Sequence, residues 1–319
     1  MDLSTRYLGF TLPHPFVCGA SPLSADLDAV IRLEDAGAAA IVMHSLFEEQ
    51  IISDAKRRPQ LTPYAPSPGR YLEHLLRVKQ RVRVPIIASL NGTTAEGWLQ
   101  YARALQRAGA DALELNVYFI ATDPQEDALT VEQRVLDIVA VVKESVSIPV
   151  AVKLSPFYSA LPNLVSRIER IGADGVVLFN RFYQADIDPG TRGVDFHLRL
   201  SDSSDLLLRL HAVAALSGRS RLSLALSGGV HEPIDAVKAI MAGAHVVQIV
   251  SALLRHGPAR LTQMRRRFEA WMNDNHYEAV ERMRGIASMA GRGDASRFER
   301  GTYVGMLQAW QRDHPPAGD

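Results

Sequence analysis

The chain contains a single cysteine, Cys18, among its 319 residues. One thiol cannot form a disulfide within the chain, and it is too few for a cysteine-ligated zinc site or an iron–sulfur cluster. Cys18 lies in the apolar run Pro15–Ala20, so we interpret it as a buried core residue rather than a nucleophile. The histidines show no His–His or His–Glu spacing typical of a metal site, and we predict no catalytic metal.

The sequence also has no excess charge of either sign, because 35 Lys and Arg residues balance 35 Asp and Glu residues. Nucleic-acid-binding proteins usually carry a basic excess, so we expect no nucleic-acid partner. No apolar run approaches the ~20 residues of a membrane span, and Met1–Arg6 lacks the apolar core of a signal peptide. We therefore expect a cytoplasmic protein without membrane contact. Hydrophobic residues make up 47% of the chain, enough for a full core, which excludes a disordered chain.

What the sequence does contain is a series of eight short apolar segments without polar alternation, which is typical of parallel strands covered on both faces. The segments between them have helical spacing, as in 96–105, 131–144 and 234–242. Eight such repeats predict an α/β fold, a (β/α)8 TIM barrel, with an open doubly wound sheet as the alternative. The expected strands are Phe16–Ala20, Ala39–Ser45, Pro85–Leu90, Ala112–Val117, Pro149–Leu154, Gly175–Asn180, Leu222–Ser227 and Val246–Ser251.

Three connections are too long for plain turns. The segments 47–83, 118–130 and 182–220 follow the second, fourth and sixth strands. They leave the carboxyl ends of the strands, where barrel active sites are built, so we predict cap insertions over the site. We expect one domain over residues 1–319, with a helical tail from about residue 255.

Lys153 is the cation in an otherwise apolar strand, Pro149–Leu154. A buried ammonium is costly unless it meets an anion or several acceptors, so we expect it to point into the mouth, the carboxyl end of the barrel. Its possible roles are a Schiff-base nucleophile, a phosphate binder or a partner for the negative charge of a reduced cofactor. The alternative is a structural ion pair.

The run Ser227-Gly228-Gly229 follows the seventh strand, and Ser251 follows the eighth. Glycines there expose backbone N–H groups, which with the next loop form a phosphate cradle in many barrels. The pattern therefore predicts a ligand with a phosphate group. A tight strand-to-helix turn is the alternative.

Asparagines stand at the ends of three strands, at Asn91, Asn116 and Asn180. Around one cavity their amides could recognise the heteroatom edge of a flat ring, whereas singly each is as often a turn or cap residue. His44, followed by Ser45, ends the second strand and is a candidate acid or base near neutral pH. A structural histidine is the alternative.

Taken together, these motifs resemble the dihydroorotate dehydrogenase family of flavin-dependent barrels. The resemblance covers most of the chain and rests on the combination rather than on any single motif. The motifs are Leu8-Gly9-Phe10 and Leu12-Pro13-His14-Pro15-Phe16, with His14 where Asn is usual, Leu115-Asn116, Val152-Lys153-Leu154-Ser155-Pro156, Phe179-Asn180, Ser227-Gly228-Gly229-Val230, Gly243-Ala244, Val247-Gln248 and Asn275-His276-Tyr277.

The resemblance implies FMN across the barrel mouth and a role in pyrimidine metabolism. Lys153 would lie beside the N1–C2 edge of the flavin and stabilise the reduced, anionic ring. Gly228, Gly229 and Ser251 would bind the phosphate. The cofactor-binding residues expected on this basis are Ala20, Ser21, Ser45, Asn91, Asn116, Lys153, Asn180, Ser227, Gly228, Gly229, Val250 and Ser251.

The chain departs from the family at the catalytic base. Tyr118-Phe119 stands where the family has a Cys or Ser base, and His44 stands where it has a lysine. We therefore take Lys153, His44 and Tyr118 as the catalytic candidates. Asn116 and Asn180, with Arg181, are the candidates for substrate binding. The expected reaction is hydride transfer between flavin and a small anionic substrate, not necessarily dihydroorotate.

Two other functions remain open from the sequence. One is a flavin-binding electron-relay subunit without substrate chemistry of its own, which would need a protein electron carrier. The other is a phosphate-binding barrel lyase that uses Lys153 as a Schiff base. Barrels of this kind often pair, so a homodimer is also an expectation.

Overall fold

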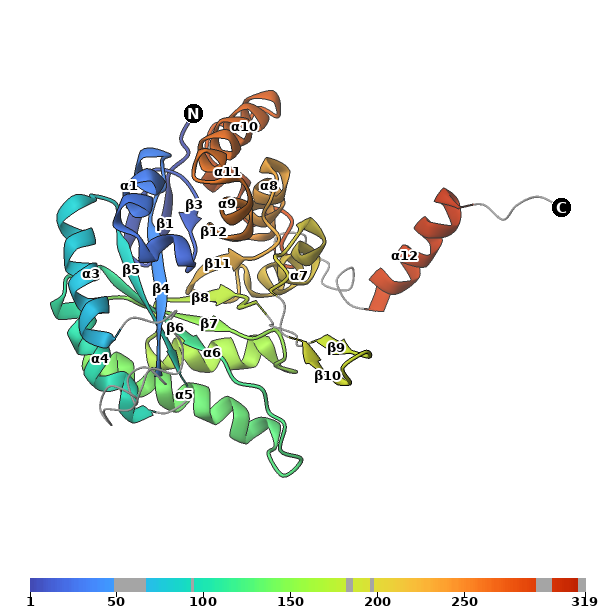
Figure 1. The fold of residues 1–319 in the computed structure, drawn as a ribbon. Helices are drawn as coiled ribbons and strands as arrows, with labels where there is room; N and C mark the ends of the chain where they lie inside the picture. Colours follow the sequence, from blue (N-terminus) through green and yellow to red (C-terminus); the bar gives the residue numbers. More distant parts are fainter. Residues whose placement is uncertain (49–66, 93–94, 182–185, 196–197, 291–299, 315–319) are drawn as a thin grey trace.

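The computed structural model describes residues 1–48, 67–92, 95–181, 186–195, 198–290 and 300–314. The predicted (β/α)8 barrel is confirmed, because eight parallel strands close into one sheet (Figure 1). Around the barrel the strands follow chain order, and β12 pairs with β3 to complete the closure. The strands are β3 (Phe16–Cys18), β4 (Ile41–Phe47), β5 (Ile86–Gly92), β6 (Ala112–Val117), β7 (Val150–Leu154), β8 (Gly175–Leu178), β11 (Ser223–Ser227) and β12 (Val246–Ile249).

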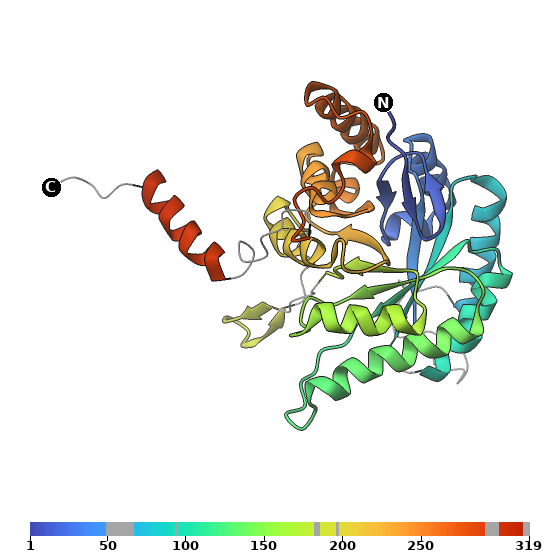
Figure 2. The same ribbon diagram turned by 180° about the vertical axis from the view of Figure 1, so that it is seen from behind.

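Helices surround the strands on the outside of the barrel (Figures 1 and 2). In the tail, α10 packs against α8 and α9, whereas α12 stands apart from the barrel in both views. The helices are α1 (Leu27–Asp35), α3 (Pro68–Arg81), α4 (Ala95–Arg107), α5 (Ala128–Ser145), α6 (Leu161–Ile171), α7 (Leu206–Leu216), α8 (Pro233–Ala242), α9 (Ser251–His256), α10 (Ala259–Asp274), α11 (Val280–Met283) and α12 (Arg300–Asp313). In the described part of the chain, no helix has both the length and the apolar character needed to cross a membrane.

A glycine turn ends α6 and leads the chain back into the sheet. Gly172 has a φ of 97°, in the left-handed region, and its N–H donates to the carbonyls of Ile168 and Glu169. Glycine reaches this conformation without the steric cost of a Cβ atom. Gly172 is therefore the C-terminal cap of α6, directly before the sixth barrel strand.

An N-terminal hairpin closes the amino end of the barrel. Its strands, β1 (Thr5–Tyr7) and β2 (Phe10–Leu12), are antiparallel. The Thr5 hydroxyl donates to the His245 carbonyl at 2.9 Å, and the Leu8 N–H donates to Ser223 Oγ at 3.0 Å. Both acceptors lie at or just before the first residues of barrel strands, so the mouth is the end left for a ligand.

The hairpin packs on an apolar layer to which every barrel strand contributes one buried side chain. Tyr7, Leu8 and Leu12 cover it from below. Burial of these side chains stabilises the closed barrel by removing apolar surface from water. The layer consists of Val17, Val42, Ile87, Ala112, Ala151, Val177, Ala225 and Val246.

Five predicted strand ends differ from the structure by two residues. The second and third strands continue to Phe47 and Gly92, and the sixth ends at Leu178 rather than Asn180. The eighth strand ends at Ile249 rather than Ser251, because Val250 leaves the extended conformation and Ser251 begins α9. The first strand ends at Cys18 rather than Ala20. Cys18 is buried, and burial raises the pKa of its thiol to about 12, which confirms it as a core residue.

The long connections contain further elements. Residues 49–66, in the first of them, lie outside the described residues, and α3 follows. The third contains a hairpin of β9 (Asp186–Asp188) and β10 (Gly193–Asp195), followed by the short helix η2 (Ser203–Asp205). That these segments cap the mouth stays a prediction.

Stability is expected to fall as pH drops from 6.5 to 4. Burial lowers the pKa of His14 and of His245 from 6.5 to about 4. The positive charge of Arg265 near His14, and that of Arg284 near His245, act in the same direction. The unfolded chain therefore binds protons at these imidazoles at a higher pH than the folded chain does. We expect the free energy of unfolding to be ~1–2 kcal/mol lower per histidine at pH 5 than at pH 7.

Urea unfolding of the wild type and of His14→Asn at both pH values measures this effect. The variant lacks one of the titrating groups, so its loss of stability between pH 7 and pH 5 should be smaller. Equal losses in the two proteins would show that the His14 imidazole does not contribute.

Candidate functional site

Polar side chains line the lumen directly above the apolar layer. They lie two residues further along their strands, and side chains two residues apart share one face of a strand. Lys153 therefore points into the lumen, as Ala151 does one layer below. The polar residues of this second layer are Ser89, Glu114, Lys153, Ser227 and Gln248, and all of them are buried.

Lys153 makes an ion pair inside the barrel. Its Nζ atom lies 3.1 Å from Glu114 Oε1 and 3.2 Å from Gln248 Oε1. The Gln248 amide in turn donates to Glu114 Oε2 at 2.5 Å. The structural ion pair considered from the sequence is thus present. Among the described residues the ammonium donates to these two acceptors, which leaves its third N–H for a ligand.

Amides form the next layer, towards the mouth. Asn116 and Asn91 lie two residues beyond Glu114 and Ser89 and face each other in the register of β5 and β6. Asn180 Nδ2 donates to Asn116 Oδ1 at 2.9 Å, and both side chains are buried. The structure thus brings the predicted amides together above Lys153, where they could contact the edge of a flat ring.

The glycine pair after β11 is required by close packing. Gly228 and Gly229 have φ values of 91° and 80°. A Cβ atom on Gly229 would lie 2.5 Å from the backbone nitrogen of Leu206, and one on Gly228 would lie 2.8 Å from Arg209 Nε. Arg209 Nε also donates to the Ser227 carbonyl at 2.5 Å. The tight turn therefore explains the glycines whether or not a phosphate binds.

Donors converge beside this turn around Ser201, a buried residue that the sequence analysis did not select. The Gly229 N–H donates to Ser201 Oγ at 3.4 Å, and the Ser201 N–H donates to Ser251 Oγ at 3.2 Å. His231 Nε2 lies 3.1 Å from Ser201 Oγ. The backbone N–H groups and hydroxyls of this cluster are the donor types that bind a phosphate group.

His44 lies at an irregularity of β4, where the pairing with β5 shifts register between Val42 and Ser45. Its backbone N–H donates to Ser24 Oγ at 2.6 Å, and its side-chain Nε2 is buried without a partner among the described residues. Burial is the main cause that lowers the pKa of His44 to about 4, and the nearby His74 contributes less. The imidazole is therefore neutral at neutral pH, and its free nitrogen is available to a ligand.

The other predicted residues lie around the same rim. Ser45 Oγ and Ser89 Oγ are 2.8 Å apart, and Arg181 Nη1 lies 3.6 Å from Asp205 Oδ2. Val250 touches the turn after β3, since a Cβ atom on Gly19 would lie 2.7 Å from its Cγ2. The remaining predicted residues are Ala20, which is partly buried, Ser21, which is buried, and Tyr118, which is partly buried after β6.

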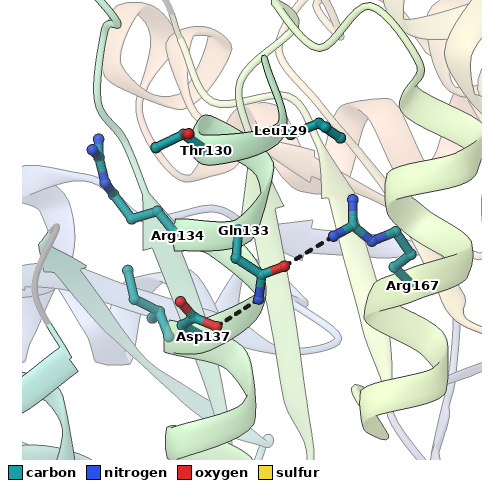
Figure 3. A pocket seen from close by; sticks show the side chains of 7 residues that line it. Leu129, Thr130, Gln133, Arg134, Asp137 and Arg167 are labelled. Carbon is teal, nitrogen blue, oxygen red and sulfur yellow. Dashed lines mark hydrogen bonds between the residues drawn. The ribbon is translucent and has the colours of Figure 1, made fainter. Parts of the chain in front are cut away.

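A groove of about 700 Å³ lies between the outer helices α5 and α6 (Figure 3). Several of its polar side chains bond to one another: Arg167 donates to Gln133, which donates to Asp137. Arg167 also pairs with Glu132 at 2.9 Å, and Arg134 pairs with Glu126. Both arginines that line the groove are therefore paired with carboxylates, so we place the site at the mouth.

Sequence reasoning missed Glu114 and Gln248. Each is a polar residue in an apolar strand, which is the same pattern that identified Lys153. Their contact joins strands on different sides of the barrel, 134 residues apart in the chain. Ser201 gave no comparable pattern, because a serine in a loop is ordinary.

The chain is similar in sequence to known proteins. A sequence model of the family described as dihydroorotate dehydrogenase matches residues 66–272, which include Lys153 and the glycine pair. The catalytic subunit of dihydroorotate dehydrogenase B (NAD(+)) from Thermoplasma volcanium is 28% identical, over 90% of this chain and 98% of that protein. The same subunit from Thermoplasma acidophilum is 28% identical, over 90% and 99%. The NAD-dependent dihydropyrimidine dehydrogenase subunit PreA of Escherichia coli is 20% identical, over 90% and 77%.

Proposed function

Since the chain belongs to the dihydroorotate dehydrogenase family, we propose that it is an FMN-dependent oxidoreductase that acts on a CH–CH bond of a small anionic substrate. The observation that carries the proposal is Lys153, a buried ammonium in the lumen below the Asn116–Asn180 pair. The relatives' names give the reaction type, an oxidation of a dihydropyrimidine compound. Bound FMN would supply the acceptor for a hydride.

The lumen residues fit a flavin ring. Reduction places negative charge on the ring, and a buried cation stabilises that charge strongly in a region of low dielectric. Lys153 has a third N–H for this purpose, and Asn116 and Asn180 supply both donors and acceptors. Beside them, Ser45 and Asn91 line the rim of β4 and β5.

The cluster around Ser201 fits the phosphate. Gly229 supplies a backbone N–H group, and Ser201 and Ser251 supply hydroxyls, all in a buried position. The turn at Gly228 and Gly229 packs closely against Leu206 and Arg209 of α7, which fixes the position of the Gly229 N–H group. We assign the phosphate to this cluster and to the turn at Val250.

His44 and Tyr118 are the groups available for proton transfer. With a pKa of about 4, His44 is a weak base at neutral pH, so it is better suited to orient a substrate through its neutral ring. Arg181 Nη1 lies 3.6 Å from Asp205 Oδ2, which is a long ion pair. We propose that Arg181 binds the anionic group of the substrate. The structure offers no thiol here, because Cys18 is buried in the core.

Phe119→Cys tests whether the missing base explains the choice of substrate. Phe119 follows Tyr118 on the loop after β6, and the Arg134 guanidinium lies 4.1 Å from its ring centre. General-base catalysis contributes ~10²–10⁴-fold, so the variant should gain detectable dihydroorotate oxidation. Anaerobic flavin bleaching by dihydroorotate measures it, with Phe119→Ala as the control for lost bulk. Bleaching in both variants alike would assign the gain to space rather than to the thiol.

An absorption spectrum tests the proposal itself. After reconstitution and gel filtration, the protein should be yellow and carry one FMN per chain. It should also be bleached anaerobically by at least one anionic dihydropyrimidine in a panel of candidate donors. A protein that stays colourless after reconstitution with FMN would contradict the proposal.

The second candidate is a flavoprotein subunit that exchanges electrons with a partner protein. The relatives named as catalytic subunits with NAD(+) favour it, since such a name implies a further subunit in those proteins. The chain's one cysteine is buried, so a cysteine-ligated carrier would belong to that partner. Rapid reduction by a small donor followed by rapid reoxidation by NAD(+), without a partner, would contradict this candidate.

We also propose that the chain forms a homodimer. Light scattering measures the molar mass in solution and tests this proposal.

The lyase alternative loses support from the structure. A Schiff-base lysine must lose its proton before it attacks a carbonyl group. Lys153 Nζ donates to the buried Glu114 carboxylate at 3.1 Å and to Gln248 Oε1 at 3.2 Å, and these contacts would have to break before the nitrogen could attack a carbonyl group.

A further inference from the structure

We propose that Glu114, acting through Lys153, sets the reduction potential of the bound flavin. The inference rests on the proposed function, because it concerns the same mouth. Glu114 is a positioning residue here: it contacts Lys153 and Gln248 in the layer below the amides.

The three side chains form a closed ring of hydrogen bonds, which we call the lumen triad. Lys153 donates to Glu114 and to Gln248, and Gln248 donates to the second oxygen of Glu114. Each oxygen of the carboxylate therefore has its own donor. The triad ties β6 and β7 to β12 across the lumen, and it fixes the position of the ammonium.

The charge of the triad matters as much as its shape. The side chains of Glu114 and Lys153 are 1% and 7% exposed, so water screens their charges little. The two opposite charges leave the pair neutral overall. Below it, burial and the Glu114 charge raise the pKa of Tyr7 well above 10, so the phenol adds no charge.

A flavin above this layer gains negative charge when it is reduced. Lys153 favours that change, and Glu114 opposes it. The carboxylate thus lowers the potential that Lys153 alone would give. A neutral amide at position 114 should make the bound flavin easier to reduce, and a second carboxylate in the triad should make it harder.

Glutamate and glutamine have the same shape, so the triad allows a charge exchange within one geometry. Glu114→Gln removes the negative charge, and Gln248→Glu adds one. The double variant E114Q/Q248E moves the carboxylate to the other side of the lumen and restores the original net charge. It also keeps an anion beside Lys153, which protects folding where a single variant leaves an uncompensated charge.

The experiment is an anaerobic dye-coupled titration of the FMN-loaded proteins. At a fixed reference potential, E114Q should raise the ratio of reduced to oxidised flavin at least tenfold, which is about 30 mV for a two-electron couple. Q248E should lower the ratio by a similar factor, and the double variant should lie between the two. Thermal unfolding of each apoprotein reports separately on folding.

Glu132→Gln is the matched control. Like Glu114, Glu132 is a buried carboxylate in an ion pair, but its partner is Arg167 and it lies on α5, outside the lumen. Its flavin potential should equal that of the wild type. Opposite shifts in E114Q and Q248E support the inference, whereas unchanged or parallel shifts in FMN-loaded variants overturn it. Failure of the wild type to bind FMN would instead contradict the proposed function.

Discussion

Lys153→Met is expected to lower the free energy of unfolding by about 3–5 kcal/mol. The substitution keeps most of the apolar stem but removes the ammonium, and it leaves the Glu114 carboxylate, 1% exposed, without its cation. A stranded buried charge costs far more than a broken surface pair. If FMN binds, the variant should also hold a flavin that is harder to reduce than that of the wild type.

Urea unfolding of the apoprotein measures the effect, and two further variants interpret it. Lys143→Met breaks a partly exposed ion pair, in which Lys143 Nζ lies 2.7 Å from Asp174 Oδ2. It should lower the free energy of unfolding by less than ~1 kcal/mol. The double variant K153M/E114Q removes the stranded charge and should regain much of the stability. A double variant as unstable as Lys153→Met would show that lost packing, and not charge, causes the effect.

Gly229→Ala is expected to abolish FMN binding and to lower the free energy of unfolding by ~3 kcal/mol or more. Two causes combine at this position. The φ of 80° is unfavourable for alanine, and the new Cβ atom would lie 2.5 Å from Leu206 N and 2.8 Å from its Cα. Both contacts are with backbone, so α7 or the turn must move.

Gly9→Ala separates these two causes. Gly9 has almost the same φ, 81°, but a Cβ atom there would meet nothing within 4 Å. Gly9→Ala should lower the free energy of unfolding by only ~1–2 kcal/mol, because alanine is unfavourable in the left-handed conformation. FMN fluorescence titration and urea unfolding of both variants make the comparison. Equal losses of stability, with FMN binding retained in Gly229→Ala, would contradict the close packing described for this turn.

Most of the fold could be predicted from the sequence, because its cause is local. Apolar runs such as 112–117 and 150–154 indicate strands covered on both faces. The errors lie at boundaries. Val246–Ser251 is apolar almost to its end, and nothing in its composition shows that the chain turns into a helix at Ser251.

The site could be predicted only in part. Lys153 was identified because a cation in an apolar strand needs a partner, yet the partner itself depends on how the barrel closes. Glu114 and Gln248 meet across the lumen, and no local pattern specifies that contact. Ser201 reaches the glycine turn through a long connection, so its place at the site required the three-dimensional structure.

A crystal structure of the FMN-reconstituted protein tests the central claim most directly. We expect the ring at the mouth with one edge beside Lys153 Nζ, and the phosphate at the turn formed by Gly229, Ser201 and Ser251. Density that places FMN elsewhere, or a mouth without a ring while Lys153 keeps only its contacts to Glu114 and Gln248, would contradict the account.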